Sequence, residues 1–153
     1  AEHPTYYDDA DGLRCPVGAH IRRLNPRGAL TTGKPHGRRI IRRGIPYGPA
    51  FDRKQPDDGI ERGLMGLFIC GDLEMQFEFL MRVWANRDIQ TRGLRNTRDP
   101  ILGAQPPEGG KFVIRTGDTR DPIELNVPRL VTTRGSLYLL IPGIGGLRYL
   151  ASL

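Results

Sequence analysis

Glycine and proline are the residues that most restrict what this chain can fold into. The 153 residues include 20 glycines and 13 prolines, about a fifth of the chain, without a collagen-like period. Both residues interrupt helices and strands, so loops must take a large share beside a few short regular elements. A helical bundle is therefore excluded. With 38% hydrophobic residues over this length, we expect one modest core and a single domain.

Short apolar runs predict the strands. Ile40 and Ile41 lie between arginine pairs in segment 38–44 and are followed by turn residues, which predicts a short strand with a solvated end. Segment 61–70, ERGLMGLFIC, is nearly continuous in apolar residues, as in a central strand covered on both faces. We expect these two strands to pair. Further strand candidates are 111–115, 128–133 and 136–142.

The hydrophobic period changes after Asp72. Apolar residues then recur at intervals of four, three and four, at Leu73, Phe77, Leu80 and Trp84. This spacing predicts an amphipathic helix capped by Asp72 and ending near Arg87. A short C-terminal helix should pack Leu147 and Leu150. Together these elements predict an α+β fold, an antiparallel sheet with helices on one side, of which ferredoxin-like packing is one member.

The charge balance points to an anionic partner. The chain has 23 basic and 17 acidic residues, and 20 of the basic residues are arginine, whose planar fork grips carboxylates and phosphates at two points. Nucleic acid, an acidic cofactor and a partner protein all fit this balance. No aromatic residue occurs between positions 20 and 45, so base stacking there is not supported and nucleic acid is not expected. No apolar run reaches 18 residues, so no membrane span is expected.

Cysteines and the first residues give weaker indications. Cys15 and Cys70 belong to no Cys-x-x-Cys pair, which argues against a disulfide framework or a zinc site. They mildly favour a reducing compartment, with a slight preference for the cytoplasm and the compartment otherwise open. DDADG (8–12) lacks the glutamate of a calcium loop, so we expect a solvated turn. The chain opens in a polar loop without an initiator Met, and we expect an N-terminal part to be absent.

Two segments are the strongest candidates for chemistry. CPVGAHIRRLNPR (15–27) contains His20, and RRIIRRGIPYG (38–48) follows about twenty residues later. An imidazole can bind a metal or a heme iron, and nearby arginines can clamp anionic groups. From the residues alone, a structural histidine and a solvated arginine face are favoured over a ligand site. His3 and His36 are weaker candidates because both lie beside proline.

These segments resemble the C-terminal half of dye-decolourising (DyP-type) heme peroxidases. The resemblance covers most of residues 13–151 in the expected order. It also includes ERGLMGLFIC (61–70), QFEFLMRVWAN (76–86), DPILGA (99–104) and LVTTRGSLYLLIPGIGGLRYLA (130–151). It implies a single heme b-binding domain over 1–153, one of two ferredoxin-like domains in the whole enzyme. It also implies that hydrogen peroxide serves to oxidise dyes or phenolic compounds.

The resemblance also implies residue roles. His20 matches the proximal histidine that binds the iron, and Arg42 matches the distal catalytic arginine. Asp121 is the carboxylate we expect to hold the outer N–H of that histidine. The remaining expected cofactor contacts are Arg27, at a heme propionate, and Leu67 and Phe68, in the apolar distal wall.

Two departures from the family pattern bear on activity. The family's distal aspartate lies in a Gly-x-x-Asp-Gly segment, and DADG (9–12) lacks the leading glycine and precedes His20 too closely. We therefore expect the acid–base residue to be missing from this chain, with weak or no turnover unless an N-terminal half of the same enzyme supplies it. Gly66 stands where a larger leucine is expected. For Tyr47, Tyr138, Tyr149 and Trp84, ordinary packing is favoured over electron relay.

The alternative from another class is a non-catalytic heme-binding or heme-delivery module, in which the Cys15 thiolate could compete with His20 for the iron. A homo-oligomer stays open under either hypothesis.

Overall fold

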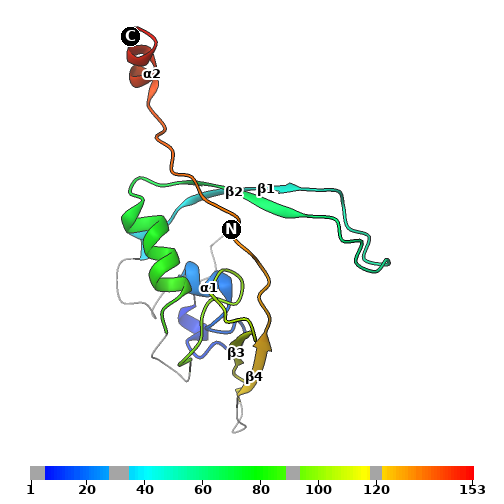
Figure 1. Cartoon of the computed structure of the whole chain (residues 1–153). Helices are drawn as coiled ribbons and strands as arrows, with labels where there is room; N and C mark the ends of the chain where they lie inside the picture. The colour runs from blue at the N-terminus through cyan, green and yellow to red at the C-terminus, as the bar shows by residue number, and fades with distance from the viewer. Residues whose placement is uncertain (1–5, 28–34, 89–93, 118–121) are drawn as a thin grey trace.

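The structure is a computed structural model, and it describes residues 6–27, 35–88, 94–117 and 122–153. Two antiparallel two-stranded sheets and a few short helices make up these residues (Figure 1), which confirms the predicted α+β class. The elements are η1 (Tyr7–Asp9), α1 (His20–Leu24), η2 (Pro35–Arg38), β1 (Ile41–Tyr47), β2 (Gly63–Ile69), η3 (Glu74–Glu78), η4 (Leu80–Ala85), β3 (Gly110–Ile114), β4 (Ile123–Val127) and α2 (Ile144–Leu150).

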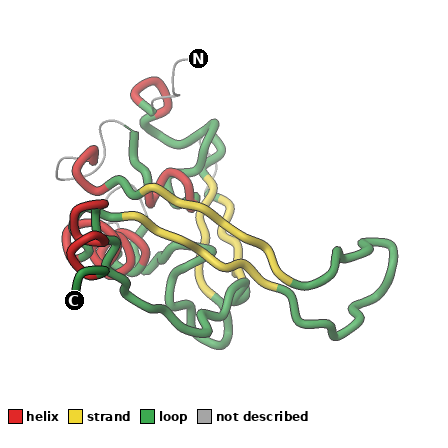
Figure 2. Tube along the Cα trace, turned by 90° about the horizontal axis from the view of Figure 1, so that it is seen from above, coloured by secondary structure: helices red, strands yellow, loops and turns green. Residues whose placement is uncertain are grey.

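Strands β1 and β2 form a long hairpin, as predicted. They pair antiparallel from Ile41↔Ile69 to Tyr47↔Gly63. Gly48 ends β1 with a φ of +88°, and a Cβ there would lie 2.7 Å from the carbonyl oxygen of Glu61. Only glycine fits this turn without strain. The hairpin and its connecting loop project away from the rest of the molecule (Figures 1 and 2).

The expected burial of the hairpin is wrong for the described residues. The pattern predicted a central strand covered on both faces, but Leu64 and Met65, which point to opposite faces, are 65% and 64% exposed. Ile41 on β1 is 66% exposed. The apolar run does form a strand, yet most of its side chains remain exposed among the described residues.

One helical rod follows the hairpin. Segments η3 and η4 are wound as π-helix, with Phe79 between them. The predicted cap is confirmed, because the Asp72 carboxylate accepts a hydrogen bond from the backbone N–H of Met75 at 2.9 Å. The described helix ends at Ala85, close to the predicted end. Among the described residues, no helix has the length and apolar character to cross a bilayer.

The core is small and lies away from the hairpin. Val17, Leu94 and Val113 form a buried cluster, and helix α1 packs against η4. The strand predicted at 111–115 is confirmed as β3, but its partner is β4, which the sequence analysis missed. Figure 1 shows β3 and β4 below α1 and the hairpin above it.

Two strands predicted in the C-terminal segment, within the described range 122–153, are not present. Residues 128–133 and 136–142 are extended but pair with no strand among the described residues, and Leu140 is 89% exposed. A strand exists only where a neighbouring strand takes its backbone hydrogen bonds, and no described strand pairs with these residues. The C-terminal helix is confirmed as α2, but Leu147 and Leu150 are 55% and 56% exposed, so their predicted packing is wrong.

Candidate functional site

His20 is held by a buried carboxylate. It is the first residue of α1, and its Nδ1 lies 3.0 Å from both carboxylate oxygens of Asp99. The Asp99 side chain is fully buried, while the His20 side chain is 24% exposed. An ionised carboxylate only accepts hydrogen bonds, so Nδ1 carries a proton, and in the neutral ring Nε2 then presents the lone pair. A ring fixed in this tautomer is suited to bind a metal ion through Nε2.

Asp99 is itself supported by backbone groups. Its Oδ1 accepts hydrogen bonds from the N–H groups of Ile101 and Leu102 at 2.9 and 2.8 Å. Burial alone raises the pKa of Asp99, but the hydrogen bonds from His20 and these N–H groups outweigh it and bring the pKa below its ordinary value. Asp99 is therefore ionised at neutral pH.

This carboxylate is not the one that the sequence predicted. Asp121, expected at the outer N–H of His20, lies outside the described residues, and the carboxylate found there is Asp99. Asp99 lies 79 positions from His20, in a loop with no hydrophobic period. The available signal was its place at the start of DPILGA, one of the segments that carry the family resemblance.

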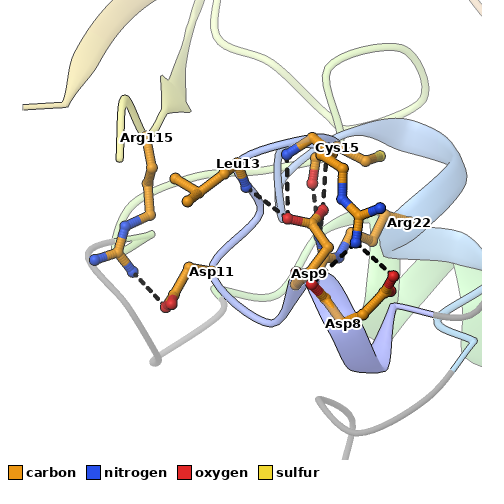
Figure 3. Close-up of polar contacts among 8 residues, drawn as sticks. Asp8, Asp9, Asp11, Leu13, Cys15, Arg22 and Arg115 are labelled. Atoms are coloured by element: carbon orange, nitrogen blue, oxygen red, sulfur yellow. Dashed lines mark hydrogen bonds and ion pairs between the residues drawn. The ribbon is translucent and has the colours of Figure 1, made fainter. Parts of the chain in front are cut away.

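A buried ion pair fixes the loop before α1 (Figure 3). Arg22 donates from Nη1 to Asp9 Oδ2 at 3.0 Å and to the carbonyl oxygen of Cys15 at 2.6 Å. The Asp9 carboxylate also accepts the backbone N–H groups of Leu13, Arg14 and Cys15 at 2.8, 3.1 and 3.0 Å. Asp9 is 8% and Arg22 3% exposed. The solvated turn predicted for 8–12 is thus wrong at Asp9, whose carboxylate serves a structural purpose.

The Cys15 thiol lies near the hydroxyl of Tyr6. Burial raises the pKa of Tyr6, and the nearby Cys15 raises it further. The Arg22 guanidinium stacks on the Tyr6 ring at 4.5 Å. The thiol that could compete with His20 for iron thus lies beside Tyr6.

Strand register sorts the predicted distal residues onto two faces of the hairpin. Arg42 lies opposite Phe68, and Arg43 lies opposite Leu67. Directly opposed residues of antiparallel strands share a face, and successive residues alternate faces. Phe68 is therefore on the same face as Arg42, whereas Leu67 is on the other face.

The ring of Phe68 fills the space above Gly66. A Cβ added at Gly66 would lie 2.7 Å from this ring, which explains how the expected leucine can be absent without leaving a gap. The ring also packs on Phe77 of η3, with 5.3 Å between centroids. Phe77 in turn contacts Tyr138 edge-on at 6.3 Å, and the Tyr138 hydroxyl donates to Glu78 at 3.0 Å.

The helical rod connects the two candidate segments. Its Phe77 touches the Arg42 face of the hairpin through Phe68, and its end at Ala85 lies against α1, which carries His20. Figure 1 accordingly shows β1 and α1 as separate layers joined on one side by this rod.

Arg27 follows α1 directly and is half-buried. Its carbonyl oxygen accepts the N–H of Tyr6 at 2.9 Å. Its expected role at a propionate stays a prediction.

The curated proteins to which the chain is similar include several dye peroxidases. It is 31% identical to the multifunctional dye peroxidase DyP2 of an Amycolatopsis species over 95% of this chain and 34% of that protein. It is 29% identical to the dye-decolorizing peroxidase msp1 of Mycetinis scorodonius over 96% of this chain and 32% of that protein. No family model matches the chain.

Solved structures agree with this result. DyP2 from Amycolatopsis matches 88% of this chain and 32% of its own, with a TM-score of 0.71 and 28% identity. A DyP-type peroxidase from Anabaena matches 82% of this chain and 28% of its own, with a TM-score of 0.64 and 27% identity. The chain spans about a third of the length of the relatives it matches. The predicted resemblance is therefore confirmed: along nearly its whole length the chain is similar to about a third of the length of dye-decolorizing peroxidases.

Proposed function

We propose that this chain is the heme-binding part of a dye-decolorizing peroxidase, in which His20 binds the iron of heme b. The hydrogen bond between His20 Nδ1 and the buried Asp99 carboxylate is the observation that carries the proposal. Iron-binding histidines almost always donate their other ring N–H to such an acceptor, which fixes the ring and makes it a stronger electron donor. A merely structural histidine needs neither a free Nε2 nor a 24% exposed side chain.

The chemistry of the residues of this chain fits a heme. Nε2 of His20 is available as a neutral nitrogen ligand, and among the described residues no hydrogen bond reaches it. Arg27 offers a cation for a propionate three residues past the end of α1. When bound, the heme supplies the redox chemistry that peroxide oxidation of dyes or phenolic compounds requires. We propose 1–153 as one heme-binding domain.

Arg42 is the proposed catalytic residue. Its guanidinium lies on an exposed strand face and would bind a peroxide oxygen, stabilising the negative charge that develops as the O–O bond breaks. One well-placed donor of this kind contributes ~3 to 4 kcal/mol in comparable oxyanion sites. Phe68, on the same face, would exclude water beside it. Leu67 points the other way and would need a different surface to cover it.

The proton that peroxide loses needs a base from elsewhere. Asp9, in the segment nearest to the family's aspartate motif, is occupied by Arg22 and three backbone N–H groups. We propose that the part of the enzyme corresponding to the other two thirds of its relatives supplies this base and covers the hairpin. The exposed apolar faces of β1 and β2 support such packing.

The second candidate is a heme-holding module without catalysis. The hydrogen bond from Arg22 to Asp9 favours this candidate, because the Asp9 carboxylate is then not available to accept the proton from peroxide. Ligation by Cys15 has less support, since the imidazole of His20 is the candidate ligand that a buried carboxylate orients.

Absorption spectroscopy of the chain titrated with heme tests the proposal. We expect a Soret band that His20→Ala abolishes and Cys15→Ser leaves unchanged. A band that survives His20→Ala but not Cys15→Ser would replace His20 with a thiolate ligand. Rapid mixing with peroxide then separates the two candidates, because a heme-loaded chain that oxidises dye at the pace of a complete peroxidase would exclude the non-catalytic one.

A further inference from the structure

A second buried arginine joins the segments that carry His20 and Asp99. Arg23 is 3% exposed, although it was expected on a solvated face. Its guanidinium donates to three carbonyl oxygens and one hydroxyl from two other segments. The acceptors are Trp84 O at 2.6 Å, Arg87 O, Thr97 O at 3.0 Å and Thr97 Oγ1 at 3.3 Å.

These contacts converge on the end of the helical rod. The last carbonyls of a helix have no partner within the helix, and here Arg23 binds that of Trp84 together with the carbonyl of Arg87, two residues past the helix. The backbone N–H of Asp99 takes the carbonyl of Ala85 between them, at 2.8 Å. Arg23 and Asp99 are therefore anchored to the same helix end.

Arg23 makes this connection without a contact ion pair. Among the residues that the structure describes, no carboxylate lies within salt-bridge distance of it. Burial lowers its pKa, and the charges of Asp99 and Asp88 only partly offset this. A buried guanidinium is tolerated when its N–H groups are hydrogen-bonded, and only the planar fork of arginine reaches acceptors on two segments at once.

We propose that Arg23 is the positioning residue of the His20–Asp99 pair. It lies one turn after His20 on α1, and it holds Thr97, two residues before Asp99, against the end of η4. In this way it fixes the distance between the imidazole and the carboxylate. The role of the pair as an iron ligand and its orienting group rests on the proposed function, whereas the positioning of the pair does not.

The heme-free chain tests the positioning directly. The Nδ1 proton of His20, held by Asp99, should give a slowly exchanging imidazole N–H signal in NMR spectra of the chain labelled with ¹⁵N-histidine. We expect Arg23→Lys and Arg23→Gln to accelerate its exchange with solvent about tenfold or more while the chain stays folded. Lysine keeps the charge but cannot span the acceptors, so both variants should act alike.

Arg22 provides the matched control. It is the neighbouring residue, it is also 3% exposed, and its hydrogen bonds go to Asp9 and Cys15 rather than toward Asp99. Arg22→Lys should destabilise the chain to a similar extent and leave the Nδ1 proton protected. Equal acceleration in the Arg22 and Arg23 variants would mean that Arg23 contributes only stability, and would overturn the proposal.

The heme-loaded chain gives a second readout. Loss of the Asp99 hydrogen bond makes the imidazole a weaker donor, so Asp99→Asn should raise the reduction potential of the iron. Arg23→Lys should shift the potential in the same direction, and adding it to Asp99→Asn should cause little further shift. If His20 binds no heme, the proposed function fails while the exchange result still stands.

A milder variant covers the case in which both Arg23 variants unfold. Thr97→Val removes one acceptor of Arg23 at nearly constant volume. Faster exchange of the Nδ1 proton in the folded Thr97→Val chain would support the proposal. Protection equal to that of the unchanged chain would overturn it.

Discussion

The residues around His20 depend on buried charges rather than on apolar packing. Asp9, Arg22, Arg23 and Asp99 are all less than a tenth exposed. Each makes several hydrogen bonds, which offsets the cost of removing a charge from water. The sequence predicted a solvated arginine face here because basic residues cluster, and nothing local indicates that Asp9, Trp84 and Thr97 fold back onto them. In contrast, the resemblance of its segment to the family singled out His20, whose role as a ligand stays a prediction.

Acid should weaken the fold through Asp99. Its folded pKa is lower than its unfolded value of 3.8, so its stabilising contribution is present above about pH 4 and is lost as the pH falls through the folded pKa. Urea unfolding between pH 7 and pH 2.5 should therefore show a shallower acid-induced loss of stability in Asp99→Asn than in the unchanged chain.

Asp58 is the control for this experiment. The hydrogen bond from Arg62 also lowers the pKa of Asp58, but the pair lies in the exposed hairpin loop and contributes little to stability. Asp58→Asn should leave the acid profile nearly unchanged. If it flattens the profile as much as Asp99→Asn does, burial is not what makes Asp99 important.

Removal of the Asp9 side chain should destabilise the fold, because it leaves the buried guanidinium of Arg22 without its counter-ion. We expect Asp9→Ala to lower the free energy of unfolding by about 3 to 5 kcal/mol, as for other broken buried pairs. Asp8 binds Arg14 at the surface, with its side chain 67% exposed. Asp8→Ala should therefore change stability by less than about 1 kcal/mol in the same denaturant titration. Similar losses in both variants would contradict the structural purpose assigned to Asp9.

At the scale of elements, the hydrophobic pattern of the sequence predicted those helices and strands that local interactions stabilise. The hairpin and the helix over 72–87 followed from hydrophobic period and a capping aspartate, and both are present. The strands expected at 128–133 and 136–142 are absent because a strand needs a neighbour that its own sequence does not encode. The hydrophobic pattern also did not predict that this helix is a π-helix, a form found frequently at functional sites.

The Arg42 face of the hairpin should respond to a single methyl group. A Cβ at Gly66 would meet the Phe68 ring at 2.7 Å, so Gly66→Ala should push this ring away and weaken its contact with Phe77. Gly44, the cross-strand partner of Gly66, has only the flexible end of Leu64 nearby, at 3.2 Å. Gly44→Ala should therefore preserve the nuclear Overhauser effects between the Phe68 and Phe77 rings that Gly66→Ala removes.

At the scale of the whole molecule, the chain exposes far more surface than its mass requires. Its accessible surface is 11885 Å², whereas a compact monomer of 17.1 kDa exposes about 7,800 Å². The excess comes with apolar side chains on the hairpin and the C-terminal segment, among them Leu64, Met65, Leu137 and Leu140. Surfaces of this kind are covered in functioning proteins, in keeping with a chain that spans a third of its relatives.

The chain alone should accordingly behave as an extended molecule with exposed apolar surface. X-ray scattering should give a radius of gyration well above the roughly 15 Å of a compact 153-residue domain, and a hydrophobic dye should fluoresce on binding. The double variant Leu137→Lys/Leu140→Lys should reduce dye binding and self-association, because both side chains lie on the uncovered C-terminal segment at 78% and 89% exposure. Leu13→Lys, at a single exposed leucine beside the core, should change neither. A radius near 15 Å without dye binding would contradict the open arrangement of the hairpin and C-terminal segment, since these segments would then be folded back onto the core.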